Sequence, residues 1–106
     1  MLAGSRIIAT DGVAAAIERL PPEAPLLLHL DGDVLDPSVA PGVDVPAVGG
    51  WDVPRLRDEM AAIADTGRLV AVSLCCGNPR SDVENRSAKA YLAGLEPVLR
   101  TGRPTA

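Results

Sequence analysis

Apolar runs separated by clusters of glycine, proline and aspartate divide the 106-residue chain into short blocks. Residues 26–30 (LLLHL) and 69–74 (LVAVSL) form two nearly unbroken apolar runs, a pattern typical of strands that are covered on both faces. A shorter run at residues 6–9 (RIIA) predicts a strand near the start of the chain. The pattern therefore predicts about three strands.

Three helices are expected between and after these strands. The first spans residues 12–20, with Asp11 as its N-cap, and ends before two consecutive prolines. The second spans residues 53–65, with Asp52 as its N-cap, and Gly67 is well placed to end it.

The third predicted helix covers residues 83–99 and begins at a cap provided by Ser81 or Asp82. Its periodicity places one set of residues on a common face, namely Ala88, Tyr91, Leu92, Leu95 and Leu99. The resulting alternation of strands and helices predicts an α/β fold with three layers (α-β-α) around a parallel sheet. Ligand sites in such sheets lie beyond the carboxyl ends of the strands.

Composition limits the classes of partner. The net charge is −4 and the sequence has no run of Lys or Arg, which argues against nucleic acid and anionic membranes. No apolar stretch is long enough to span a bilayer and the N-terminus lacks the pattern of a secretion signal, so a cytoplasmic location is expected. Because Cys75 and Cys76 are adjacent, a structural disulfide between them is disfavoured. Two small residues at a strand end are the preferred interpretation, and a redox pair is the alternative.

Three aspartates follow the second predicted strand directly. Asp31, Asp33 and Asp36 precede a loop rich in proline and glycine that ends on Gly49 and Gly50. Carboxylates at this position suit a hard cation such as magnesium, manganese or calcium. Asp31 and Asp33 are two residues apart, so in extended backbone they point to the same side. The alternative for both is that they cap the strand end and form a turn, and Asp36, which precedes a proline, is best explained as a turn residue.

The sequence LHLDGDVLDPSVAPGVDVPAVGG resembles the second metal-binding signature of the ureohydrolases, the family of arginase, agmatinase and formimidoylglutamase. The match includes Asp31, Asp33, the Asp36-Pro37 pair, an Ala-Pro-Gly stretch and the closing glycines. The resemblance extends through the Asn78-Pro79 strand end and covers nearly the whole chain, as a C-terminal portion of the family's domain. It implies residues 1–106 as one arginase-like domain fragment, with residues 101–106 as a loose tail.

The resemblance also implies a chemistry. Family enzymes use two manganese ions, which activate water for hydrolysis of a carbon–nitrogen bond in a guanidino or amidine substrate. Carried over by position, Asp31 and Asp33 are metal ligands, and Asp36 is a turn residue outside the ligand set. His29 is best interpreted as a core histidine. The alternative is that it contacts the metal ligands without binding the metal itself.

The sequence departs from the family pattern in three ways. It contains neither the Gly-Gly-Asp-His segment nor the Asp-Ala-His-x-Asp segment that supplies the other ligands. Cys76 stands where the family has a glutamate that holds the substrate guanidinium, and a thiol is uncharged at its ordinary pKa. Asp44 and Val45 replace the usual Gly-Thr of the loop.

These features leave two functional hypotheses. The first is a ureohydrolase part whose manganese site is completed by an N-terminal half on another chain. The second is a non-catalytic remnant that acts by association, including with copies of itself. A haloacid-dehalogenase-type phosphatase also uses Asp-x-Asp after a strand, but it requires Gly-Thr where this sequence has Val34 and Leu35.

Overall fold

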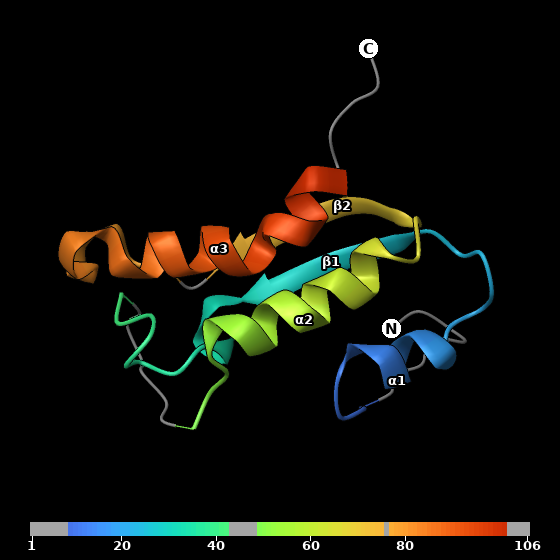
Figure 1. The fold of residues 1–106 in the computed structure, drawn as a ribbon, viewed down its shortest axis with the longest axis horizontal. Coiled ribbons are helices and arrows are strands. Elements are labelled where there is room, and N and C mark those ends of the chain that lie inside the picture. The colour runs from blue at the N-terminus through green and yellow to red at the C-terminus, as the bar shows by residue number, and fades with distance from the viewer. Residues whose placement is uncertain (1–8, 43–48, 76, 102–106) are drawn as a thin grey trace, which may run out of the picture.

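In the computed structural model of the chain, the described residues are 9–42, 49–75 and 77–101 (Figure 1). The helices and strands occur in the order α1 (Val13–Glu18), β1 (Leu26–Asp31), α2 (Val53–Ala64), β2 (Leu69–Cys75) and α3 (Arg86–Thr101). Short 3-10 turns lie at Gly32–Val34, Pro79–Ser81 and Val83–Asn85. The predicted α/β class is confirmed.

The described strands form one parallel sheet. β1 pairs with β2, and the register places His29 opposite Ser73 and Asp31 opposite Cys75. Both carboxyl ends therefore meet at one edge, as a parallel sheet requires. The strand predicted at residues 6–9 lies almost entirely outside the described residues.

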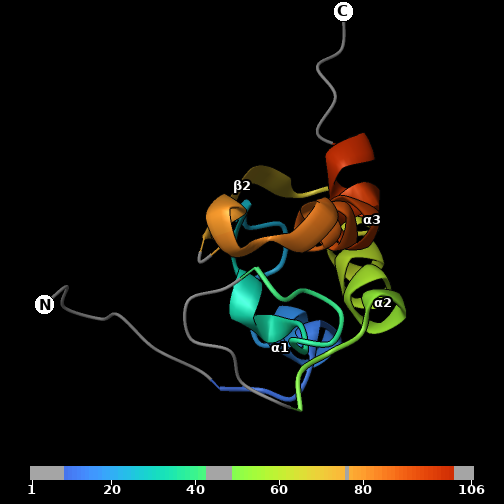
Figure 2. The same ribbon diagram turned by 90° about the vertical axis from the view of Figure 1, so that its left-hand side faces the viewer.

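α2 and α3 pack side by side against one face of this sheet (Figures 1 and 2). On β1, Leu26 and Leu30 are buried beneath them, whereas Leu27 on the opposite face is 77% exposed. The prediction that both strands are covered on both faces is therefore wrong for the described part of the chain. An unbroken apolar run has no polar alternation to show which face a neighbouring element covers.

The predicted ends of α2 are confirmed. The Asp52 carboxylate accepts a hydrogen bond from the Arg55 amide at 2.9 Å, which satisfies a backbone donor of the first turn. Gly67 follows the helix with a φ of 68°, a left-handed conformation that glycine adopts at low cost.

The predicted cap of α1 is wrong. Gly12, not Asp11, stands at the N-cap position, and no side chain of that residue can accept a hydrogen bond. The Val13 amide instead donates to the Glu59 carboxylate of α2 at 2.6 Å. A tertiary contact from 46 residues away thus replaces the expected local cap.

α3 begins later than predicted. Glu84 and Asn85 have φ values of 55° and 58°, so a right-handed helix cannot run through them. The cap itself does come from Asp82, whose carboxylate accepts hydrogen bonds from the amides of Ser87 at 2.7 Å and Ala88 at 3.0 Å. The helical periodicity of the sequence did not reveal the 3-10 turn of Val83–Asn85 that lies between this cap and the helix.

The buried face of α3 is rotated from the predicted one. Tyr91 and Leu95 are buried as expected, but Leu92 is 62% exposed and Ala88 and Leu99 are also exposed. Gly94 explains the rotation, because a Cβ atom on it would lie 2.3 Å from Cδ2 of Leu56. α2 and α3 therefore approach each other closely at Gly94, and Ser87, Ala90 and Val98 join the buried side.

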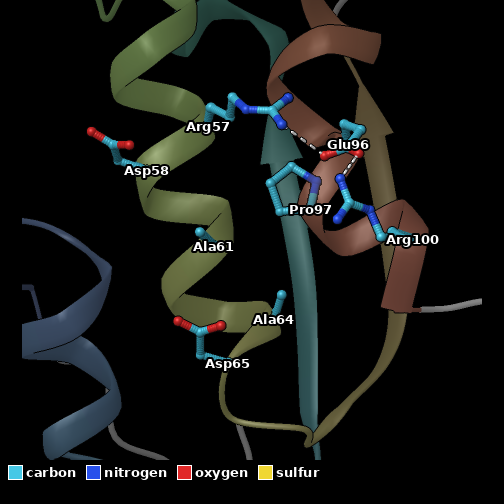
Figure 3. A pocket seen from close by; sticks show the side chains of 8 residues that line it. All are labelled: Arg57, Asp58, Ala61, Ala64, Asp65, Glu96, Pro97 and Arg100. Carbon is cyan, nitrogen blue, oxygen red and sulfur yellow. Dashed lines mark hydrogen bonds and ion pairs between the residues drawn. The ribbon is translucent and has the colours of Figure 1, made fainter.

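A proline inside α3 is accommodated by α2. Pro97 has no amide hydrogen to donate to the carbonyl of Ala93, one turn earlier. Arg57 of α2 supplies the missing donor, since its Nη1 lies 3.0 Å from that carbonyl oxygen. Its Nη2 also donates to Glu96 at 3.0 Å, and Arg100 binds the same carboxylate (Figure 3). These side chains line a hollow of about 320 Å³ between α2 and the second half of α3.

We expect Arg57→Ala to lower the free energy of unfolding by about 1 kcal/mol, the usual net value of one hydrogen bond. In a Pro97→Ala background the restored amide satisfies the Ala93 carbonyl, so the same arginine change should cost measurably less. Urea denaturation of the four proteins measures this coupling. Arg100→Ala is the matched control, because it removes an arginine from Glu96 without touching Ala93. Equal costs of Arg57→Ala in both backgrounds would contradict the assignment.

Candidate metal centre

The first two aspartates of the signature lie in a turn at the end of β1. The Asp31 carboxylate accepts a hydrogen bond from the Asp33 amide at 2.9 Å and so initiates the 3-10 turn of Gly32–Val34. The chain is not extended here, so the expectation that Asp31 and Asp33 share a strand face does not hold. The turn forms because a short aspartate side chain competes for a nearby backbone amide.

Asp33 carries an unusual oxygen. Its Oδ1 is the one buried side-chain nitrogen or oxygen atom of the described residues that has no hydrogen-bond partner. A buried carboxylate oxygen without a partner is costly, and such atoms in native proteins call for a water or an ion. The donor chemistry of Asp31 and Asp33 fits a hard cation at this point.

These two carboxylates form only part of a metal site. Within the described ranges, no three His, Cys, Asp or Glu side chains are close enough together to hold a metal ion. The residues therefore fit manganese as contributors to a larger site, which needs further donors.

Tyr91 of α3 packs directly over this turn, a contact that sequence reasoning did not foresee. A Cβ atom at Gly32 would lie 2.5 Å from the Tyr91 hydroxyl oxygen, so a larger residue there would have to displace the Tyr91 ring. The hydroxyl lies 3.5 Å from the Gly32 carbonyl oxygen. The sequence feature that could have drawn attention to Tyr91 is the scarcity of aromatic residues, because Tyr91 is one of two in the chain.

Asp36 holds the two ends of the signature loop together. Its carboxylate accepts hydrogen bonds from the amides of Ser38 at 2.9 Å and Gly49 at 2.8 Å. Hydrogen bonds from the Ser38 amide and hydroxyl, then from the Gly49 amide, lower the pKa of Asp36. Both carboxylate oxygens are thus occupied by protein donors.

A short backbone bridge closes the same loop. Leu35 pairs with Trp51, and the Trp51 amide donates to the Val34 carbonyl at 2.7 Å. Gly50 lies between, where an added Cβ would meet backbone atoms of residues 34–36 within 2.6–2.7 Å. The second glycine of the closing pair is therefore required by close backbone approach.

The start of α3 anchors the Ala-Pro-Gly stretch of the loop. The Gly42 amide donates to the buried Ser87 hydroxyl at 2.6 Å, and the Asn78 amide donates to the Gly42 carbonyl at 2.6 Å. Arg86 donates to the Ser38 carbonyl at 2.9 Å. The loop, the Asn78-Pro79 strand end and α3 therefore form one connected structure beside the aspartates.

Low pH should destabilise the start of α3, which the Asp82 carboxylate caps. Burial opposes ionisation of Asp82, but hydrogen bonds from the Ser87 and Ala88 amides outweigh it and lower the pKa of that carboxyl. A carboxylate whose pKa is lower in the folded state stabilises the fold above its unfolded pKa of about 4, and that stability is lost as the pH falls through the folded pKa.

We therefore expect the melting temperature to be steady from pH 7 to 5 and to fall below pH 4. Thermal melts followed by circular dichroism measure this, and Asp82→Asn should reduce the slope of the acid limb. Asp65→Asn, at the exposed end of α2, is the matched control. An acid limb unchanged by Asp82→Asn would count against the capping role.

Of the remaining predicted site residues, His29 is the one that the structure describes, and it lies on β1. His29 is exposed rather than in the core, because it points away from α2 and α3. Its Nδ1 lies 2.6 Å from the Ser73 hydroxyl, and its Nε2 lies 3.4 Å from the Cys75 sulfur. Cys75 is not in a disulfide. Cys76 and Asp44 lie outside the described residues.

None of the helices among the described residues has the length and apolar character needed to cross a membrane.

Comparison with known proteins places this geometry in a family. The model of the arginase family matches residues 5–96. A formimidoylglutamase of Nocardia farcinica is 39% identical over 62 residues, which cover 58% of this chain and 20% of that protein. The chain therefore spans about a fifth of the length of this curated relative.

Solved structures agree with the sequence match. An arginase from Bacillus caldovelox is 30% identical, with a TM-score of 0.67 over 89% of this chain and 30% of that one. A formimidoylglutamase from Bacillus subtilis shares the fold at 22% identity, with a TM-score of 0.69 over 83% of this chain and 27% of that one. With its signature aspartates at the carboxyl edge of a parallel sheet, this chain belongs to the arginase family of ureohydrolases.

Proposed function

We propose that this chain contributes Asp31 and Asp33 to a manganese-dependent ureohydrolase site that donors beyond its 106 residues complete. The buried Oδ1 of Asp33, which has no hydrogen-bond partner among the described residues, is the observation that carries the proposal. A cation would satisfy this oxygen. Membership of the arginase family supports the reaction class, hydrolysis of a non-peptide carbon–nitrogen bond.

The other residues described above position the two aspartates. Asp36 fixes the loop ends through two amides, and Ser87 holds the loop against α3. Tyr91 covers the turn that carries Asp33. When bound, manganese would supply a Lewis acid and an activated water at neutral pH. The protein's own part is to present carboxylate oxygens in a fixed geometry.

Cys76 bears on the substrate. A guanidinium is a planar cation that pairs best with a carboxylate in a two-point contact, and a neutral thiol cannot make that contact. We therefore propose a substrate whose amidine-like group does not depend on such a pair. In the completed enzyme, Cys76→Glu is expected to favour guanidino substrates.

Complementation tests the proposal. The chain is mixed with an N-terminal segment of a family enzyme that carries the two metal motifs missing here, and manganese-dependent release of urea or ammonia is measured. Activity is expected with the wild-type chain and is expected to be abolished by Asp31→Ala or Asp33→Ala.

Asp58→Ala, an exposed change on α2, is the matched control and should leave activity intact. Absence of release from every mixture, or release that survives loss of Asp33, would reject the enzyme assignment. Circular dichroism of each variant separates loss of the site from loss of the fold.

A second candidate function is an association module without catalysis. The observation that favours it is the uncovered sheet face, on which Leu27 is 77% exposed. Apolar faces and open sheet edges invite pairing with other chains. Sedimentation would show concentration-dependent self-association in that case, whereas a monomer with a sharp unfolding transition would count against it.

A further inference from the structure

The uncovered face of the sheet carries a row of polar side chains across both strands. His29 and Asp31 lie on the opposite side of β1 from the buried Leu26 and Leu30, because side chains alternate along a strand. The parallel register places Ser73 and Cys75 beside them on β2. Asp33, the key residue of the proposed function, is not in this row.

Two of these side chains already stand at the spacing of metal ligands. The distance between His29 Nε2 and Cys75 Sγ is 3.4 Å. Zinc bonds of about 2.0–2.1 Å to nitrogen and 2.3 Å to sulfur, at a tetrahedral angle, separate the two donor atoms by about 3.5 Å. A cation of this size would therefore fit between them with little movement.

The other ring nitrogen of His29 is held as in many metal sites. Nδ1 lies 2.6 Å from the Ser73 hydroxyl. When Nδ1 carries the proton and donates it to Ser73, the lone pair of Nε2 faces the sulfur. Histidine ligands almost always have their second nitrogen engaged in this way, which fixes the tautomer and the ring orientation.

A third donor is close but is not yet in place. Asp31 is exposed, is the register partner of Cys75, and follows His29 by two residues on the same strand face. Because no three such groups are preassembled among the described residues, the Asp31 carboxylate must turn toward the pair when an ion binds. Water would fill the fourth position of a tetrahedral shell.

We propose that His29 and Cys75 bind a borderline-soft divalent cation of the zinc class, with Asp31 as the third protein ligand. Thiolate and imidazole favour zinc or cobalt, whereas an all-carboxylate site favours manganese. The thiol proton passes to the solvent as the sulfur–metal bond forms. An ion bound here would also draw Asp31 away from the manganese ligand set.

Cobalt(II) serves as the probe, because a cobalt–thiolate bond gives a charge-transfer band in the near ultraviolet. The reduced full chain is titrated with cobalt, and about one equivalent is expected to produce the band. Zinc should then bleach it, while manganese at the same concentration should not. Cys75→Ser is expected to abolish the band, and His29→Gln is expected to weaken cobalt affinity at least tenfold. Ser73→Ala is expected to weaken cobalt affinity by roughly 10–100-fold, the usual effect of removing the hydrogen-bond partner of a metal-binding histidine.

Cys76→Ser is the matched control for a nearby thiol and should retain the band. Asp33→Ala should also retain it, although the same change abolishes the proposed hydrolytic function, so the two proposals fail separately. Absence of the band in the folded wild-type chain would overturn the inference. A band that depends on Cys76 rather than Cys75, or that ignores His29→Gln, would overturn it as well.

Discussion

Leu56→Ala is expected to lower the free energy of unfolding by about 2–5 kcal/mol, the usual cost of truncating a fully buried leucine. Leu56 is 0% exposed and fills the contact between α2 and α3 at Gly94. In a small domain with few large side chains, that loss is a substantial part of the total stability. Urea denaturation followed by circular dichroism measures the change.

A second substitution makes this prediction specific. Gly94→Ala alone should destabilise the fold, because its new methyl group would meet Leu56 at 2.3 Å. In the Leu56→Ala background the same methyl enters the vacated space, and alanine is the better helix former by about 1 kcal/mol. The Cβ of residue 56 would still lie 3.2 Å from the new methyl group, so Gly94→Ala should cost much less there than in the wild type.

Leu92→Ala, at a position that is 62% exposed on the same helix, is the matched control and should have little effect. Equal costs for Leu56→Ala and Leu92→Ala would show that α2 and α3 do not pack as described.

Gly50→Ala is expected to cost about 3 kcal/mol, from overpacking together with the strain on two backbone hydrogen bonds. The added Cβ would lie 2.6 Å from the Asp36 nitrogen, and the neighbours are backbone atoms that cannot rotate away. The bridge between Leu35 and Trp51 would have to open, which releases the base of the signature loop.

Gly49→Ala provides the comparison at the neighbouring position. Gly49 has a φ of 89°, and no atom of the described residues lies within 4 Å of a Cβ added there, so alanine meets chiefly the left-handed strain of about 1–2 kcal/mol. Denaturation followed by circular dichroism reports the fold, and Trp51 fluorescence reports the bridge. Gly50→Ala as mild as Gly49→Ala would contradict the close approach.

Local signals in the sequence were enough for the elements that depend on local interactions. The capping aspartate and the terminal glycine of α2 act within a few residues, so the predicted helix at 53–65 matches Val53–Ala64 closely. The apolar runs likewise located both described strands.

Features set by distant contacts were missed. The start of α1 is held by Glu59, and the start of α3 is displaced by one 3-10 turn that contains two left-handed residues. The buried face of α3 was predicted wrongly because Gly94 is buried against α2, and a search for apolar residues at helical spacing does not include glycine. His29 was expected in the core because its neighbours in the strand are apolar.

For the candidate site, the motif located the aspartates but not their surroundings. Tyr91 over Gly32 and Ser87 beneath Gly42 both come from α3, dozens of residues later in the sequence. Their roles depend on how α3 docks onto the loop. The pairing of His29 with Cys75 depends on strand register, which the two apolar runs did not specify.

Manganese content of the purified chain tests the central claim most directly, that Asp31 and Asp33 are part of a metal site whose other donors lie elsewhere. The chain is loaded with manganese, passed through gel filtration and analysed for metal. We predict well under one equivalent in the wild type, at the level of Asp31→Ala and Asp33→Ala. One or two equivalents retained by the wild type and lost in both variants would contradict the account, because the 106 residues would then hold a complete site.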